Sequence, residues 1–425
     1  MKKVQLITMG CSKNRVDSEH LLRRLQRQGC IISPEGEDLV TAGVDEVIIN
    51  TCGFIKDAKE ESIEAILEAV EAKKQGFIKS IRVFGCLSQR YRDELIEEIP
   101  EVDRFDGILT FENTDRLLTT PGHYAYLKIS EGCDRRCSYC AIPHIRGPHV
   151  SVPMEKLVEE ATLLAGQGVK ELIVIAQDTT FYGLDLYGRR RLGDLLEKLA
   201  LIPGIEWIRL HYSYPDGFPE DVLHIMAENP KVCKYIDIPL QHSADKVLEA
   251  MRRSVDGRQT RALVEKMRRI VPGVVLRTTM MVGHPGEGEA EFEDLLSFVK
   301  DYPFERLGAF TYSEEDGTWG AEHLRDEVPE AVKQERYNRL MELQSGISEK
   351  FNVARIGSRE RVIVDSFTDG VLVARSQSES PEVDGEILIG DEKSLGGFVP
   401  SSLIGSFANV QIKSAGEYDL LAELI

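Results

Sequence analysis

The chain has 425 residues, which is too long for a single ordinary hydrophobic core, so two or three domains are expected. Its 42% hydrophobic and 29% charged residues are typical of globular proteins, and no run of about 18 apolar residues predicts a helix that crosses a membrane. From the absence of such a run we expect a cytoplasmic protein without a membrane association. The net charge of −19 argues against stable binding to nucleic acid and favours a basic partner.

Residues 1–118 alternate apolar runs with amphipathic helical patterns, which predicts an α/β domain with a parallel sheet. The helix after the first strand is expected to begin near Asp17 or Ser18, since either side chain can cap its free N–H groups. The expected strands are 4–10, 45–51 and 80–85.

One cysteine directly follows each of these strands: Cys11, Cys52 and Cys86. The carboxyl ends of neighbouring parallel strands form the ligand-binding crevice at one edge of a sheet. We therefore expect these three thiols, which are far apart in the sequence, to converge on one site.

Residues 119–356 repeat a strand followed by a helix about six times, which predicts an incomplete (β/α)6 barrel of the TIM type. In such barrels the chemistry lies on the loops that follow the strands. A charged helix over about 329–355 is expected to connect this barrel to the last block. The expected strands are 126–130, 171–177, 205–212, 235–240, 274–283 and 306–312.

Residues 357–425 are rich in β-forming residues that are interrupted by Gly, Asp and Ser turns, which predicts a small antiparallel β-barrel. This block carries 5 Lys or Arg and 12 Asp or Glu, a net charge of −7. A barrel that binds RNA should be basic with exposed aromatic side chains, whereas an acidic barrel suits the docking of a basic protein.

The stretch EGCDRRCSYC, residues 131–140, places Cys133, Cys137 and Cys140 in the loop after the first expected barrel strand. Closed zinc sites need four protein ligands, so zinc here would have to borrow a distant cysteine or histidine. Soft thiolates suit iron-sulfur clusters, and three of them on a four-iron cluster leave one iron open.

In this position EGCDRRCSYC resembles the signature of radical S-adenosylmethionine enzymes. The resemblance implies that the methionine part of the cofactor chelates the open iron, and that an electron delivered through the cluster releases a 5′-deoxyadenosyl radical. Such a radical can take hydrogen from a substrate carbon that acid-base catalysis cannot activate. We therefore expect no catalytic triad and assign no catalytic residue beyond the cluster ligands.

The segments MGCSKNRVDSE, NTCGF and FGCLSQR and the β-rich last block extend the resemblance to the methylthiotransferases over nearly the whole chain. This implies that Cys11, Cys52 and Cys86 hold a second four-iron cluster, which serves sulfur insertion. The implied domains are a cluster-binding methylthiotransferase domain at 1–118, a radical S-adenosylmethionine domain with its connecting helix at 119–356, and a TRAM-like barrel at 357–425.

Two branches of that family differ in their targets, which are an aspartate of ribosomal protein S12 in one and an adenosine of tRNA in the other. The segment GCSKNRVDSE resembles the protein-modifying branch, which tends to read GCPKNxVDSE, more than the tRNA branch, which tends to read GCQMN; Ser12 departs from the usual proline. The acidic last block independently favours the basic ribosomal protein. The tRNA reaction is the alternative.

The resemblance also implies a reaction that uses two molecules of S-adenosylmethionine. One would methylate a sulfur attached to the amino-terminal cluster. The other would supply the radical that removes hydrogen from the β-carbon of the aspartate, which then takes up the methylthio group. A low-potential electron donor such as flavodoxin or ferredoxin is the implied partner.

VGHPGE at 282–287 resembles the family's GFPGE segment near the adenosine, with His284 in place of the usual phenylalanine, although a plain turn before a helix would read the same. Four polar residues after the second and fourth barrel strands lie where cofactor or substrate contacts fall, and ordinary polar loop residues would look identical. The candidate cofactor-binding residues are Gln177, Asp178, Gln241, His242, Gly283, Pro285, Gly286 and Glu287.

Cys30 and Cys233 fit neither group of cysteines and are expected to be buried as small apolar side chains. The basic pair Arg252 and Arg253 is expected on a solvated face. Two functions of other classes stay open. An electron carrier with two clusters would not need so large a barrel, and a zinc-dependent RNA-binding protein would contain zinc without iron or sulfide.

Overall fold

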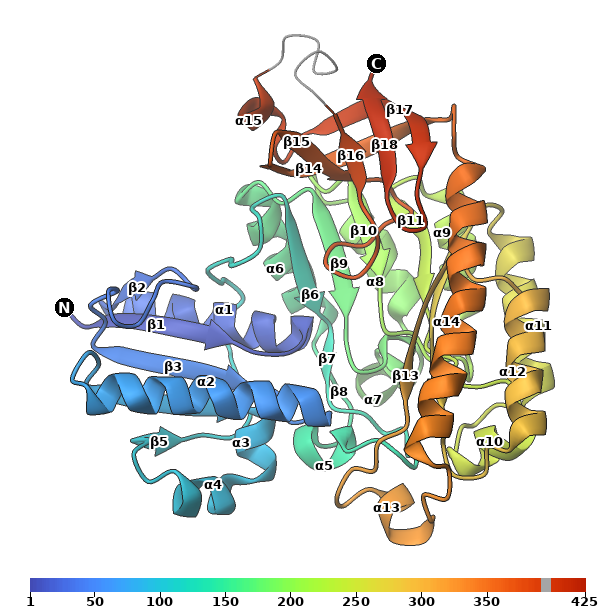
Figure 1. The fold of residues 1–425 in the computed structure, drawn as a ribbon. Helices are drawn as coiled ribbons and strands as arrows, with labels where there is room; N and C mark the ends of the chain where they lie inside the picture. Colours follow the sequence, from blue (N-terminus) through green and yellow to red (C-terminus); the bar gives the residue numbers. More distant parts are fainter. Residues whose placement is uncertain (391–398) are drawn as a thin grey trace.

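The computed structural model describes residues 1–390 and 399–425, and it places an amino-terminal sheet, a central sheet and a carboxyl-terminal barrel along the chain (Figure 1). Within these residues, no helix combines the length and the hydrophobicity that crossing a lipid bilayer requires. Three residues counted in the charge of the last block, Asp391, Glu392 and Lys393, lie outside the described residues.

The amino-terminal sheet is parallel throughout and packs against helices on both faces. Its elements are β1 (Lys3–Thr8), α1 (Ser12–Arg27), β2 (Ile31–Ser33), β3 (Glu46–Thr51), α2 (Lys56–Lys74), β4 (Ser80–Gly85), α3 (Cys86–Arg90), α4 (Arg92–Glu98) and β5 (Arg104–Phe105). The strand order is β2-β1-β3-β4-β5. The three expected strands are confirmed as β1, β3 and β4, whereas the edge strands β2 and β5 are too short to show a period in the sequence.

The helix α1 begins at Ser12, so its expected start near Asp17 or Ser18 is wrong. Both expected caps lie inside the helix and are buried, because Ser18 packs against the amino-terminal sheet and Asp17 pairs with Lys128 and Arg146. Asn50 of β3, for example, donates a hydrogen bond to Ser18 Oγ at 3.0 Å. Cys11 therefore occupies the N-cap position, next to the free N–H groups of the helix.

The central sheet has six parallel strands and does not close, which confirms the incomplete (β/α)6 barrel. Its strands are β6 (Tyr124–Lys128), β9 (Glu171–Ile175), β10 (Trp207–Leu210), β11 (Val232–Asp237), β12 (Val275–Val282) and β13 (Arg306–Thr311), and a small pair consists of β7 (Ser130–Glu131) and β8 (Val150–Ser151). Its helices are α5 (Ile142–Arg146), α6 (Met154–Gly166), α7 (Leu184–Tyr187), α8 (Leu192–Ala200), α9 (Glu220–Glu228), α10 (Asp245–Ala250), α11 (Gly257–Ile270), α12 (Glu289–Asp301) and α13 (Trp319–His323).

The two faces of the central sheet differ in chemistry. On one face, side chains such as Leu127 and Leu172 pack in the large core beneath the helices. The alternate side chains form what we call the inner face, which is largely polar or aromatic. The inner face includes Tyr126, Glu171, Ile173, Arg209, His211, Tyr235, Asp237 and Arg277.

The last block forms a closed five-stranded barrel in the order β14-β15-β16-β18-β17. Its elements are β14 (Arg359–Thr368), β15 (Val371–Arg375), β16 (Ile387–Ile389), α15 (Pro400–Leu403), β17 (Phe407–Ala415) and β18 (Leu420–Leu424), and the predicted connecting helix is confirmed as α14 (Glu330–Val353). Four of the strand pairs are antiparallel as expected, but β16 and β18 pair in parallel.

The loop between β15 and β16, residues 376–386, fixes this barrel to the inner face of the central sheet. Ser380 Oγ lies 2.8 Å from His211 Nε2, and the hydroxyl of Tyr235 donates to Asp384 at 2.6 Å. The carboxyl-terminal barrel therefore supplies part of the wall around the inner face.

A buried carboxylate also joins the two units. Glu171 is fully buried, and its oxygens lie 2.8 Å from Arg209 of β10 and 2.8 Å from Arg375 of β15. Burial raises the pKa of Glu171, but the two guanidinium groups lower it by more, so the carboxylate stays ionised.

We expect Glu171→Gln to lower the free energy of unfolding by about 3–5 kcal/mol, because it leaves buried cations beside a neutral partner. Urea unfolding followed by circular dichroism measures this difference. The control Glu423→Gln breaks the exposed pair with Lys413 and should cost less than about 1 kcal/mol. Equal losses in the two variants would contradict the prediction.

Candidate functional site

Cys11, Cys52 and Cys86, the amino-terminal thiol group, lie together at the carboxyl ends of their strands. Cys11 follows β1, Cys52 follows β3, and Cys86 opens α3 directly after β4. A Cβ atom on Gly10 would lie 2.9 Å from Cys52 Sγ, and the charges of Cys11 and Cys86 both act on the Cys52 thiol. The structure thus brings together the three thiols that the strand pattern predicts to converge.

The three thiols of this group differ in how readily they ionise. Burial raises the pKa of Cys52 to about 12 and also raises the pKa of Cys86. Burial opposes ionisation of Cys11 as well, but the charges of Lys13 and Arg146 and the N–H groups of α1 outweigh it, so the pKa of Cys11 lies below its usual value. Because clusters bind thiolates, loading this site with iron must release protons.

Cys133, Cys137 and Cys140, the loop thiol group, lie in the loop that follows β7. The N–H of Cys133 donates to the Gly147 carbonyl at 3.1 Å, and the N–H of Cys140 donates to the Cys137 carbonyl at 3.1 Å. Burial raises the pKa of Cys133 to about 12 and raises the pKa of Cys140 as well. These backbone bonds fold the loop back on itself, so its three thiols are neighbours.

Arg253 contacts the loop thiol group, so its expected place on a solvated face is wrong. Its guanidinium group lies 3.8 Å from Cys137 Sγ and donates to the Pro239 carbonyl at 2.6 Å. Arg252 is exposed, as expected. Two adjacent arginines look alike in the sequence, and only the packing of α10 against the cysteine loop distinguishes them.

The loops that carry the two thiol groups meet across the boundary between the amino-terminal sheet and the central sheet. Cys86 of the first group packs against Ala141 and Ile145 in one apolar cluster. Ala141 directly follows Cys140 of the second group in the chain. The loops that carry the two groups are therefore in contact.

Arg146, at the end of α5, bridges the two loops. It is 8% exposed, and its Nε donates to Cys86 Sγ at 3.3 Å. The same guanidinium group donates to Asn14 Oδ1 at 2.6 Å, to Glu131 at 2.8 Å and to Asp17 at 3.2 Å. The sequence offers no sign of this role, because an arginine six positions after a cysteine belongs to no known ligand spacing.

The donor sets fit iron-sulfur clusters. Each group offers three thiols, and all six are free of disulfides. Among the described residues no three His, Cys, Asp or Glu side chains are arranged around a single metal ion, whereas a cluster spreads its ligands over several irons. In the same part of the chain the side-chain oxygens of Gln177 and Gln241 are buried without a hydrogen-bond partner, which is the state expected of groups that a ligand satisfies.

Asp178 and Glu287, two other expected cofactor contacts, already have protein partners, whereas His242 Nε2 is buried without a hydrogen-bond partner among the described residues. Asp178 accepts hydrogen bonds from Arg135 and Thr180, both at 2.9 Å. Glu287 accepts from the Gly283 N–H at 2.9 Å and lies 3.4 Å from His242 Nε2. Their cofactor role stays a prediction.

The turn at 283–287 depends on glycine. Gly283 has a φ of +78°, and a Cβ there would lie 2.3 Å from Lys333 Cγ; Gly286 has a φ of +94°. The Pro285 carbonyl lies 2.9 Å from His284 Nδ1, inside the same turn. The turn is therefore built tightly against α14, and its proposed contact with a cofactor stays a prediction.

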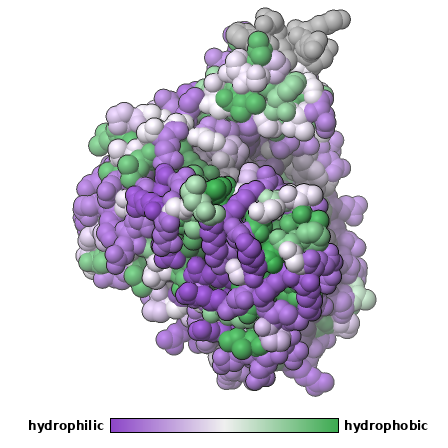
Figure 2. Space-filling model, turned by 90° about the vertical axis from the view of Figure 1, so that its left-hand side faces the viewer, coloured by the Kyte–Doolittle hydropathy of each residue, from purple (hydrophilic) through white to green (hydrophobic). Residues whose placement is uncertain are grey.

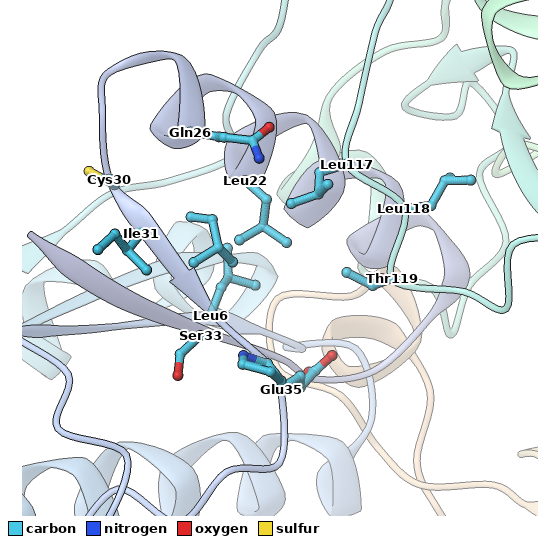
Figure 3. Close-up of a pocket in the computed structure, with 12 residues that line it drawn as sticks. Leu6, Leu22, Gln26, Cys30, Ile31, Ser33, Glu35, Leu117, Leu118 and Thr119 are labelled. Atoms are coloured by element: carbon cyan, nitrogen blue, oxygen red, sulfur yellow. The ribbon is translucent and has the colours of Figure 1, made fainter. Parts of the chain in front are cut away.

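A cavity of about 600 Å³ beside the edge strand β2 is separate from this site (Figure 3). Leu6, Leu22 and Cys30 are among its lining residues, and none of the six grouped cysteines is. The outer face of the amino-terminal unit is mostly hydrophilic with scattered apolar patches (Figure 2). Cys30 is only partly buried, so its expected burial is wrong, whereas Cys233 is fully buried as expected.

The inner face carries strained and aromatic groups near the two thiol groups. Tyr212, which follows β10, has a φ of +56°, and Lys13 Nζ lies 2.9 Å from the centroid of its ring. His211 stacks on Tyr235 at a ring-centroid distance of 5.8 Å. Burial, together with the charges of nearby cations, lowers the pKa of His211 to about 3.

Three family models match successive parts of the chain. The model of an uncharacterized protein family, UPF0004, matches residues 3–107. The radical SAM superfamily matches residues 127–299, and the TRAM domain matches residues 356–425.

Curated proteins named ribosomal protein uS12 methylthiotransferase RimO are similar to this chain from end to end. The protein from Porphyromonas gingivalis is 50% identical over 100% of this chain and 99% of its own length. That from Bacteroides thetaiotaomicron is 48% identical over 100% of this chain and 98% of its own length. The chain belongs to the RimO family of radical S-adenosylmethionine methylthiotransferases. It is therefore a transferase that uses an iron-sulfur cluster and S-adenosylmethionine.

A solved structure of the radical S-adenosylmethionine methyltransferase TsrM from Kitasatospora setae, with cobalamin and a 4Fe-4S cluster bound, shares the fold. The TM-score is 0.52 with 14% sequence identity, over 73% of this chain and 75% of that chain. At this identity the likeness concerns the fold alone.

We expect the buried His211 to make folding sensitive to mild acid. The folded pKa of about 3 lies below the unfolded value of 6.5, so the histidine stays neutral in the fold, and stability is lost as the pH falls below 6.5. Between pH 7 and pH 5 this linkage amounts to about 2 kcal/mol. Urea unfolding at both pH values should show that His211→Gln removes this share of the pH dependence.

The matched control is His224→Gln, which changes an exposed histidine of α9. Its pH dependence should equal that of the unmodified chain. The prediction would be wrong if both variants retained the full slope.

Proposed function

We propose that this chain attaches a methylthio group to the β-carbon of an aspartate in ribosomal protein uS12. The names of its full-length relatives support the substrate. The observation that carries the chemistry is the contact between the loops that hold the two thiol groups, where Cys86 packs against Ala141, the residue after Cys140. A reaction that joins sulfur from one cluster to a carbon radical made at another requires the two clusters to be close.

In this proposal the chain holds two 4Fe-4S clusters and uses two molecules of S-adenosylmethionine. Cys133, Cys137 and Cys140 would hold the cluster that binds the cofactor, and Cys11, Cys52 and Cys86 would hold the second. When bound, the first cluster and the cofactor supply a radical that can take hydrogen from an unactivated carbon.

The chain's own residues bind and orient the reactants. The free side-chain oxygens of Gln177 and Gln241 would accept hydrogen bonds from donor groups of the cofactor. The turn at 283–287 would form part of the wall of the cofactor site. Asp178, which pairs with Arg135, and His242, which lies beside Glu287, would form another part. Arg146 holds the two cysteine loops together through its hydrogen bonds to Cys86, Glu131 and Asn14.

The acidic carboxyl-terminal barrel would dock the basic ribosomal protein, but only part of its charge is available. Asp365, Glu379 and Asp384 point inward and pair with Arg375, Arg306 and the hydroxyl of Tyr235. The exposed acidic residues of the described part are Asp369, Glu382, Glu386, Glu417, Asp419 and Glu423. A low-potential flavodoxin or ferredoxin would supply the electrons.

Mass spectrometry tests the substrate. The reconstituted enzyme is incubated without oxygen with uS12, bulk tRNA, S-adenosylmethionine, sulfide and a reductant. We expect a methylthio group on one aspartate of uS12 and none on tRNA. A methylthio group on adenosine with uS12 unchanged would overturn the proposal in favour of the tRNA reaction.

Cysteine variants test the division of labour between the clusters. Cys133→Ala should abolish both cofactor cleavage and methylthio transfer, because it removes a ligand of the radical-generating cluster. Cys52→Ala should keep cofactor cleavage and lose transfer, with the iron content reduced by about half. Cys30→Ala should leave both activities intact. Loss of cofactor cleavage in Cys52→Ala would contradict the assignment of separate roles.

A further inference from the structure

Lys13 is a buried cation that forms no ion pair with an Asp or Glu side chain among the described residues, although its charge acts on the nearby Cys11 thiol. The residue is 7% exposed, and its ammonium group lies on the ring of Tyr212. Lys333, which is buried to a similar degree, pairs with Asp326 at 2.6 Å. Because burial of a charge without an ion-pair partner is costly, a carboxylate that the described residues do not provide would stabilise a lysine in this position.

The place of Lys13 shows where that anion would lie. Lys13 stands two residues after Cys11, in the first turn of α1, and reaches to Tyr212 on the inner face of the central sheet. Its ammonium group therefore lies between the amino-terminal thiol group and the radical-generating side of the molecule. Arg15, the next basic residue of the same helix, differs because it has Glu382 at 3.8 Å.

The backbone around this position supports a binding role. Tyr212, which supplies the ring beneath Lys13, is held at a φ of +56°, and Gln241, whose side-chain oxygen lacks a partner, is held at +73°. Such conformations are costly for residues other than glycine and cluster at ligand-binding sites. Lys13 thus packs on one of two strained residues that follow neighbouring barrel strands.

We propose that Lys13 binds the carboxylate of the aspartate that is modified, an assignment that rests on the proposed function. The reacting β-carbon is bonded directly to the carboxylate carbon, so a single ion pair fixes the position of the carbon that must receive sulfur. The substrate also supplies the anion that the buried ammonium group lacks. Aromatic packing on Tyr212 limits the ammonium group to one side and leaves its N–H donors for the carboxylate.

The experiment compares Lys13→Met with the unmodified enzyme on two forms of uS12. One form carries the target aspartate, which mass spectrometry of the unmodified enzyme identifies, and the other carries asparagine there. The unmodified enzyme should bind the aspartate form about 10- to 100-fold more tightly than the asparagine form. Lys13→Met should bind both forms alike, and Lys13→Arg should keep most of the preference. Iron content and the cluster spectrum are recorded for each variant, because Lys13 stands two residues after Cys11 in the chain.

The control Lys74→Met makes the same chemical change at an exposed pair with Glu101 in the same domain, and it should keep the full preference. An unchanged preference in Lys13→Met would overturn the assignment. Loss of iron or an altered cluster spectrum with an unchanged preference would also overturn it, because Lys13 would then serve the cluster alone. An unmodified enzyme that leaves uS12 untouched would instead overturn the proposed function.

Discussion

The arrangement of the site depends on one buried cation, Arg146. Burial alone would lower the pKa of its guanidinium group, but Asp17, Cys86 and Glu131 raise it well above the usual value, so the charge is kept. Removing one partner of such a buried charge is strongly destabilising. The amino-terminal domain supplies Asp17 and Cys86, and the cysteine loop supplies Glu131 and Arg146 itself. Arg146 therefore ties the segment that carries the loop thiol group to Asp17 and Cys86 of the amino-terminal unit.

The inner face of the central sheet carries buried polar side chains, which is unusual for a parallel sheet. Strands of a parallel sheet are usually apolar on both faces, because helices cover them. Here the inner side carries Arg209, His211 and Arg277, and the loop 376–386 of the carboxyl-terminal barrel satisfies several of them. The barrel thus acts as a structural wall of the radical domain as well as a surface that faces outward.

Because the barrel also packs against the central sheet, not all of the acidic residues of the last block are available to a substrate. Its net charge of −7 favours a basic partner, and the relatives act on a ribosomal protein according to their names. Several of its acidic residues, such as Glu379 and Asp384, nevertheless form internal contacts with Arg306 and Tyr235. The attraction for a substrate must therefore come from the exposed acids, and total charge overstates it.

Local patterns in the chain are enough to predict the alternation of strands and helices, the six barrel strands, the long helix α14 and the two groups of three cysteines. Period and spacing are properties of short segments, so no distant contact is needed to read them. Local patterns fail where a contact joins distant segments. The capping pattern predicts too late a start for α1, whose polar first turns are held by Asn50, and the pair of adjacent arginines predicts a surface position for Arg253, which reaches Cys137. Arg146 and Asn14 are separated by 132 positions, and Lys13 and Tyr212 lie in different domains. A charged side chain looks the same in the sequence whether water or another domain surrounds it, so only the folded chain decides which charges are buried and what they bind.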